Sequence, residues 1–186
     1  MLLDRDDLIR GLRQLVGKLR EAGEPAGIRL VGGAALSLRY FDRRNTEDID
    51  AALHPSHPVL EAAAEIAAQN EWATDWLNSR AEHFIPIAKD VGWELLYSNG
   101  GISIWVASAP ALLAMKLQAS RAGRDDDDIA KLLTICQVSS REQADELYES
   151  YYPGEVLPDK AHRLLDALLA QGLPELPEPP ERPTFS

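Results

Sequence analysis

Apolar residues recur every three or four positions from Leu8 to Leu19, near the start of the chain. This spacing places them on one face of a helix. Asp4 ahead of the run and Gly23 behind it are residue types typical of helix starts and helix ends. The pattern therefore predicts an amphipathic helix between these two residues.

In the next segment, the period of the hydrophobic pattern changes twice. Residues 27–31 ("GIRLV") form a short apolar run, the pair Gly32–Gly33 follows, and "AALSLRYF" comes next. This order is typical of a buried strand, a glycine turn and a helix. Residues 47–53 ("EDIDAAL") then alternate, with Asp48 and Asp50 on the face opposite Ile49. Alternation with a period of two predicts a strand that has one apolar face and one acidic face.

The remaining pattern separates a part that bears strands from a helical part. Residues 59–69 predict a helix, and residues 92–108 predict two strands joined at Asn99–Gly100, a pair typical of hairpin turns. From Pro110 to Gly172 the apolar spacing is helical. We therefore predict an α/β fold: a small mixed sheet of about four strands flanked by helices in residues 1–108, with an all-helical C-terminal extension, residues 109–172, packed on it.

The last segment, residues 173–186, has five prolines and three glutamates. This composition predicts an extended, mobile tail that is not part of the core.

Composition narrows the class of protein. Hydrophobic residues make up 45% and charged residues 26% of the 186 positions, which is typical of a globular domain. No apolar stretch approaches the roughly 20 residues that cross a bilayer, and the acidic N-terminal residues differ from a signal peptide. We therefore expect a cytoplasmic protein with no membrane partner. The single cysteine, Cys136, excludes an internal disulfide.

The formal net charge of −11 disfavours a protein whose whole surface binds nucleic acid. A local basic cluster, formed by Arg39, Arg43 and Arg44, nevertheless follows the glycine pair. The charge therefore weakens an RNA-binding interpretation without excluding it.

Residues 28–53 contain two features that suggest chemistry. A glycine pair between a strand and a helix allows a sharp turn and leaves the first N–H groups of the helix open to a phosphate. Asp48 and Asp50 lie about 7 Å apart along one side of a strand, and their oxygens suit Mg²⁺ or Mn²⁺. Each feature alone has an ordinary alternative, because glycine turns are common connections and alternating aspartates commonly face water.

The order of "VGG", a helix and "DID" resembles the signature of the DNA polymerase β-like nucleotidyltransferase superfamily, which couples a glycine turn to a two-aspartate metal site. The longer run "RLVGGAALSLRYFDRRNTEDIDAAL" is similar to the minimal nucleotidyltransferase domains of AbiEii-type abortive-infection toxins, the toxins of type IV toxin–antitoxin pairs, and of their uncharacterised relatives. Later segments, "DWLNSRAEHFIP" and "ASAPALLAMKLQASRAGRDDDDIAKLL", extend the similarity over residues 28–133.

The resemblance implies roles for particular residues. Asp48 and Asp50 would hold the metal, and Gly32, Gly33 and Lys116 would bind the triphosphate of an NTP. Further nucleotide-binding roles are implied for a set of residues that match the motifs of the relatives: Arg44, Thr46, Arg121, Asp125 and Asp128. The Trp-x-Asn element matches Trp76 and Asn78.

The roles implied for Lys116 and for the acids near Asp125 have structural alternatives. The third catalytic carboxylate has no clear match in the sequence. A lysine such as Lys116 on an apolar helix usually extends to the surface, and the acids from Asp125 to Asp128 are typical of a helix N-terminus. The superfamily commonly has a third catalytic carboxylate. Glu94 is the best positional candidate for it, because the strand "ISIWVAS" carries no acid.

The function implied by the resemblance is metal-dependent transfer of a nucleotide from an NTP to a hydroxyl group, with Mg²⁺ or Mn²⁺ as cofactor. The acceptor would be the 3′ end of a tRNA or a protein, and the chain would be a toxin neutralised by a cognate antitoxin. The alternative is a catalytically inactive module of the same fold that acts through a protein partner. The acidic composition fits this alternative.

Overall fold

The computed structural model describes residues 2–43, 45–121 and 123–185. Helix α1, Arg5–Ala22, forms where the leucine spacing predicts it. Asp4 caps its start, since its side chain accepts from the Asp7 N–H at 2.8 Å while Asp7 accepts from the Asp4 N–H at 3.2 Å. Gly23 ends the helix with a φ of 71°, a conformation that favours glycine.

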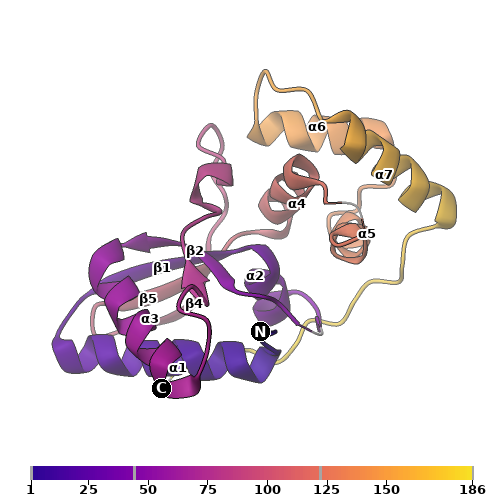
Figure 1. The fold of residues 1–186 in the computed structure, drawn as a ribbon. Helices are drawn as coiled ribbons and strands as arrows, with labels where there is room; N and C mark the ends of the chain where they lie inside the picture. Colours follow the sequence, from indigo (N-terminus) through magenta and orange to yellow (C-terminus); the bar gives the residue numbers. More distant parts are fainter. Residues whose placement is uncertain (1, 44, 122, 186) are drawn as a thin grey trace. The chain divides into compact units, whose positions relative to one another are not determined.

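The sheet is mixed, with strand order β3-β2-β1-β5-β4 (Figure 1). Its strands are β1 Ala26–Val31, β2 Ile49–His54, β3 Leu77–Asn78, β4 Glu94–Asn99 and β5 Ile102–Val106. Strand β1 pairs antiparallel with β2 and parallel with β5. The α/β class and the mixed sheet are confirmed. The additional strand β3 is only two residues long, too short for a periodic signal in the sequence.

One face of the sheet is buried and the other is partly open. Ile28, Ala51 and Ile104 on neighbouring strands are fully buried, whereas Asp50 alternates with the buried residues of β2 and stays partly exposed. Helix α2, Gly32–Arg39, follows β1 in the chain, and helix α3, Ser56–Asn70, follows β2. Helix α1 contacts both of them. The predicted alternation in residues 47–53 is therefore confirmed.

Trp76 anchors the short strand β3. Its side chain is fully buried, and its indole N–H donates to the Ala63 carbonyl of α3 at 2.9 Å. A Cβ at Gly11 would lie 2.6 Å from the Trp76 ring, so α1 needs glycine at this point to approach the tryptophan. The indole thus holds β3 in place beside β2.

The chain divides into two compact units, and the division differs from the predicted boundaries. The sheet unit comprises residues 1–83, 93–107 and 178–186, and the helical unit comprises residues 84–92 and 108–177. The segment 84–92, which we assigned to the α/β domain, joins the helices because Lys89 donates to the Ser150 hydroxyl at 2.9 Å and the Tyr152 hydroxyl donates to the Phe84 carbonyl. These contacts are long-range and leave no pattern in the sequence.

The helical unit contains α4 Ala109–Ala119, α5 Asp126–Ile135, α6 Arg141–Tyr151 and α7 Asp159–Gln171, which confirms the helical character of residues 109–172. A short 3₁₀ turn, Glu82–Phe84, lies where the chain first passes from the sheet unit. Pro110 lies in the first turn of α4, as expected. No helix in the described ranges is both long enough and apolar enough to cross a membrane.

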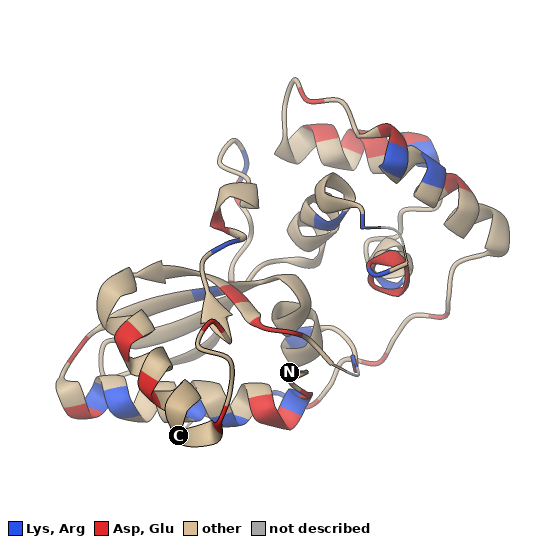
Figure 2. Ribbon diagram, viewed as in Figure 1, with Lys and Arg blue, Asp and Glu red and all other residues tan. Residues whose placement is uncertain are grey.

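The end of the chain does not behave as the predicted separate tail. Residues 173–185 form no helix or strand, but Phe185 is only 2% exposed and packs edge-on against Tyr97 at 6.0 Å between ring centroids. Arg13 of α1 donates to the Thr184 carbonyl at 3.1 Å, and Arg182 donates to the Leu95 carbonyl of β4. The ribbon of α1 in Figure 2 carries both basic and acidic positions. A proline-rich segment has few N–H groups for its own carbonyls, and arginine supplies the donors here.

The docked C-terminus gives a stability prediction. Phe185→Ala should lower the free energy of unfolding by about 3 kcal/mol, because a buried aromatic ring is lost from the sheet unit. Urea denaturation followed by circular dichroism measures this change. Leu176→Ala is a control, because Leu176 is 68% exposed and its loss should change stability by less than about 0.5 kcal/mol. Equal unfolding curves for both variants would contradict the docking.

Candidate functional site

The antiparallel pairing of β1 and β2 brings the glycine turn to the aspartates. Val31, the last residue of β1, lies directly opposite Asp50. Gly32 follows with a φ of 63°, and a Cβ at this position would lie 3.1 Å from Asp50 Oδ2. Glycine is therefore needed here both for the backbone conformation and for the close approach of the carboxylate.

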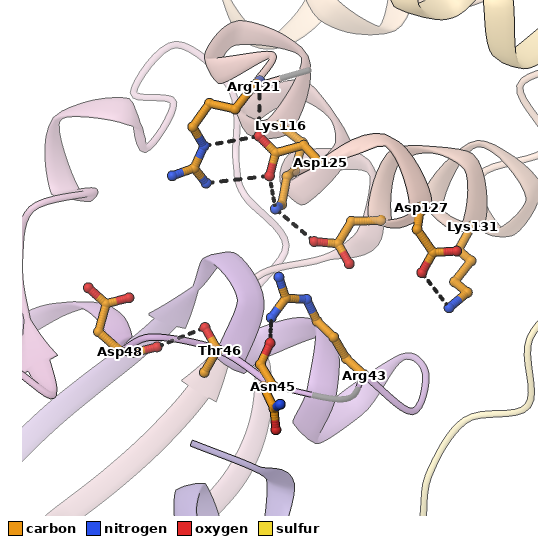
Figure 3. Close-up of polar contacts among 10 residues, drawn as sticks. Arg43, Asn45, Thr46, Asp48, Lys116, Arg121, Asp125, Asp127 and Lys131 are labelled. Carbon is orange, nitrogen blue, oxygen red and sulfur yellow. Dashed lines mark hydrogen bonds and ion pairs between the residues drawn. The ribbon is translucent and has the colours of Figure 1, made fainter. Parts of the chain in front are cut away.

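The loop after α2 folds back over the second glycine. A Cβ at Gly33 would lie 2.8 Å from Thr46 Oγ1 and 2.9 Å from Arg43 Nη1. Thr46 is fixed by backbone hydrogen bonds with Leu3, at 2.7 and 2.9 Å, and its hydroxyl donates to the Asp48 carbonyl at 3.1 Å (Figure 3). The guanidinium of Arg43 thus lies beside the first turn of α2, where N–H groups and the helix dipole favour an anion.

Asp48 is held by residues from β3 and the segment after it. The Asn78 Nδ2 group donates to Asp48 Oδ2 at 2.9 Å, and Arg80 Nη1 lies 3.9 Å from the same oxygen. Arg80 pairs mainly with Asp75; this hydrogen bond raises the pKa of Arg80 and lowers that of the Asp75 carboxyl. Asn78 itself is buried, with 7% of its surface exposed.

We call Gly32, Gly33, Arg43, Thr46, Asp48 and Asp50 the glycine–aspartate site. The sequence predicts binding roles for all of these residues except Arg43, which it places with Arg44 near the mouth of the site. Asn78 was recognised as part of a Trp-x-Asn element but received no role. In the sequence, Arg43 and Asn78 stand out only as polar residues beside apolar runs. This pattern alone does not indicate which residues they contact.

The glycine–aspartate site fits a divalent cation that is bound by two carboxylates together with substrate phosphates. Asp48 has a side chain that is 24% exposed, and Asp50 lies two residues later on the partly open face. In the part of the chain that the structure describes, no group of three or more His, Cys, Asp or Glu residues is arranged to hold a metal. Mg²⁺ is commonly bound by one or two carboxylates together with substrate phosphates. Two carboxylates on one strand face, one of them against the glycine turn, fit this mode.

Glu94 is not brought to the aspartates. It lies on β4, three strand spacings from β2, or roughly 14 Å. Its carboxylate accepts from Arg39 Nε at 2.7 Å, a hydrogen bond that raises the pKa of Arg39. The strand order separates this candidate third carboxylate from Asp48 and Asp50. Strand order depends on long-range pairing, which the spacing along the chain does not reveal.

The remaining candidates, apart from Arg44, form a second cluster inside the helical unit. Lys116 of α4 donates to Asp125 Oδ1 at 2.6 Å and to Asp128 Oδ2 at 2.8 Å (Figure 3). Lys116 is 6% exposed and Asp125 is fully buried. Arg121 Nε donates to Asp125 Oδ2 at 3.1 Å. Lys116 does not extend to the surface as an isolated lysine would.

The electrostatics of this cluster show how its buried charge is tolerated. Burial by itself would raise the pKa of Asp125, but the charges of Lys116 and Arg121 and their hydrogen bonds hold it below the usual value. Asp125 therefore stays ionised in the helical unit. Arg44, for which we predicted nucleotide binding, lies outside the described residues.

Comparison with known proteins gave one family. A family model described as a nucleotidyltransferase of unknown function (DUF6036) matches residues 8–162, which is more than half of the chain. Comparisons with curated proteins and with solved structures gave no match. The matched range includes both the glycine–aspartate site and the cluster of Lys116, Asp125 and Asp128.

Proposed function

We propose, from the premise that this chain belongs to the family of nucleotidyltransferases of unknown function, that it transfers a nucleotide from an NTP to a hydroxyl group with Mg²⁺ or Mn²⁺ as cofactor. The observation that carries the proposal is the register of β1 and β2, which sets Asp50 opposite the residue before the glycine turn. The turn that would bind phosphate and a carboxylate that would bind the cation are thereby adjacent.

The glycine turn, Arg43 and the two aspartates of the glycine–aspartate site each have a role in this proposal. The N–H groups at the start of α2 and the Arg43 guanidinium bind the triphosphate. Asp48 and Asp50 would hold the divalent cation. When bound, the cation neutralises charge on the phosphate oxygens.

The reaction is an in-line displacement. The acceptor oxygen forms a bond to the α-phosphorus while the bond from that phosphorus to the bridging oxygen of the β-phosphate breaks. The acceptor hydroxyl gives its proton to water, and pyrophosphate leaves with the electron pair of the broken bond. Rate acceleration comes from positioning the reactants and from stabilising charge, as in other phosphoryl transfers.

The roles that the resemblance assigns to Lys116, Arg121, Asp125 and Asp128 remain part of the proposal. So do Arg44 and Thr46 as nucleotide-binding residues. The acceptor is a hydroxyl at the 3′ end of a tRNA or on a protein, and the biological role is that of a toxin paired with an antitoxin. None of these finer assignments is needed for the chemistry of the glycine–aspartate site.

Incubation with labelled NTPs tests the proposal. The protein would be mixed with each α-labelled NTP, Mg²⁺ or Mn²⁺, and total RNA, and the label would be followed into RNA and into protein by gel electrophoresis and intact mass. We expect label on one acceptor class, with loss of label when EDTA removes the cation. Absence of label with every NTP, with no change in melting temperature on adding NTP and cation, would support the inactive binding module instead.

A matched pair of amide substitutions tests the position of Glu94. Glu94→Gln should leave nucleotide transfer close to the wild-type rate. The substitution removes only an exposed ion pair with Arg39, which contributes less than about 1 kcal/mol to stability. Asp50→Asn should lower transfer about a hundredfold or more, because it removes charge from the cation site. If the two variants lost transfer activity equally, Glu94 would have to be assigned to the catalytic site. The measurement is the initial rate of label incorporation.

A further inference from the structure

Asn78 lies on the strand next to the two aspartates of the glycine–aspartate site. Strand β3 pairs parallel with β2, and Asn78 lies directly beside Asp50 in the register. Directly paired residues on neighbouring strands project from the same face of a sheet. The Asn78 side chain therefore reaches the partly open face, where it meets Asp48 rather than Asp50.

The hydrogen bonds of Asn78 determine the orientation of its amide. Oδ1 accepts from the Arg80 N–H at 2.9 Å, while Nδ2 donates to Asp48 Oδ2 at 2.9 Å and to the Asp75 carbonyl at 3.2 Å. Reversing the amide would place its oxygen against two acceptors and its NH₂ against a donor. The buried side chain thus has one orientation, in which an N–H group points at the carboxylate.

This contact holds the Asp48 carboxylate through one of its two oxygens. In the described ranges, the polar contacts of the Asp48 carboxylate fall on Oδ2, from Asn78 at 2.9 Å and from Arg80 at 3.9 Å. A cation that binds Oδ1 would therefore displace neither of these contacts. An amide donor that fixes a ligating carboxylate is a common outer contact of metal sites, and losing one typically costs 10–100-fold in affinity or activity.

We propose that Asn78 is a positioning residue of the cation site: its neutral amide holds Asp48 in place, so that the site binds its divalent cation with two carboxylates and no third acid. This inference rests on the proposed function and deepens it. A carboxylate at position 78 would place an oxygen where Nδ2 now lies, 2.9 Å from Asp48 Oδ2. Two carboxylates this close repel each other unless a cation or a proton lies between them.

The test measures binding of Mn²⁺ alone, without nucleotide, to the full-length protein, with free Mn²⁺ counted by electron paramagnetic resonance. The variants are Asn78→Ala and the double variant Asp48→Ala/Asp50→Ala. The matched control is Asn70→Ala, since Asn70 also donates two hydrogen bonds, to Gln14 and to the Ile66 carbonyl, but lies on α3. We expect Asn78→Ala to weaken Mn²⁺ binding about tenfold and Asn70→Ala to leave it unchanged.

A second variant keeps the test informative if Asn78→Ala does not fold. Asn78→Asp has the same shape and keeps the acceptor for the Arg80 N–H. It should melt at a lower temperature than the wild type in EDTA and gain more from Mn²⁺, since the added carboxylate is repelled by Asp48 without a cation and assists binding with one. A purely structural role of Asn78 would change both melting temperatures equally.

The outcomes separate this inference from the proposed function. If the double aspartate variant loses Mn²⁺ binding while Asn78→Ala binds as tightly as the wild type, the positioning role is wrong and the proposed function stands. If the double aspartate variant binds Mn²⁺ like the wild type, the cation site itself is misassigned. An unchanged response of Asn78→Asp to EDTA and Mn²⁺ would also overturn the positioning role.

Discussion

Replacing both Asp48 and Asp50 with alanine is expected to abolish nucleotide transfer, by about three orders of magnitude or more, without unfolding the protein. The loss follows from removing the carboxylates that would hold the cation against the transferred phosphate. Both side chains are partly exposed, and among the described residues the Asp48 carboxylate accepts a close hydrogen bond from Asn78. The fold therefore depends little on them.

The measurement combines label incorporation with the melting temperature of the same preparation. Asp42→Ala/Glu47→Ala is the control, because it removes two exposed acids from the same loop and changes the net charge equally. We expect the control to retain activity and both double variants to melt near the wild-type temperature. Transfer that persists after loss of Asp48 and Asp50 would contradict the assignment of the site.

The second large effect is expected for Lys116→Ala in the helical unit. This substitution removes the ammonium that pairs with two buried carboxylates, Asp125 and Asp128. Breaking a buried ion pair from one side typically costs about 3–5 kcal/mol. We therefore expect a loss of this size in the free energy of unfolding, measured by chemical denaturation.

Lys131→Ala is the control, because Lys131 pairs with the exposed Asp127 one helical turn away and should cost less than about 0.5 kcal/mol. Any loss of transfer in Lys116→Ala must be separated from this instability. The triple variant Lys116→Met/Asp125→Asn/Asp128→Asn removes all three buried charges, and Arg121, which loses the Asp125 carboxylate, has a half-exposed side chain. It should therefore be more stable than Lys116→Ala. If the folded triple variant transfers nucleotide at the wild-type rate, Lys116 acts only in stability.

Local features of the sequence predicted the elements that carry most of the site. The spacing of Leu8 to Leu19 predicted α1, the glycine pair predicted the turn into α2, and the alternation around Ile49 predicted the faces of β2. These signals depend on residues close together in the chain, whose geometry follows from the helical and strand periods. The order of glycines and aspartates then indicated the family.

The tertiary structure decided which of these residues meet. The antiparallel register placed Asp50 beside Gly32, and the strand order placed Glu94 far from both. The two-residue strand β3 brought Asn78 to Asp48, and the C-terminal residues docked through Phe185. Each of these results depends on pairing between segments far apart in the chain.

By itself, therefore, the sequence determined the helices, the main strands and the two motifs of the site. Its residues and their periods are sufficient for this, because each element buries its own apolar face. Only the tertiary structure decided the neighbours of Asp48, the separation of Glu94 from the aspartates and the ion pairs of Lys116. Those contacts depend on strand order, register and helix packing, which are selected by the burial of the whole core rather than by any local pattern.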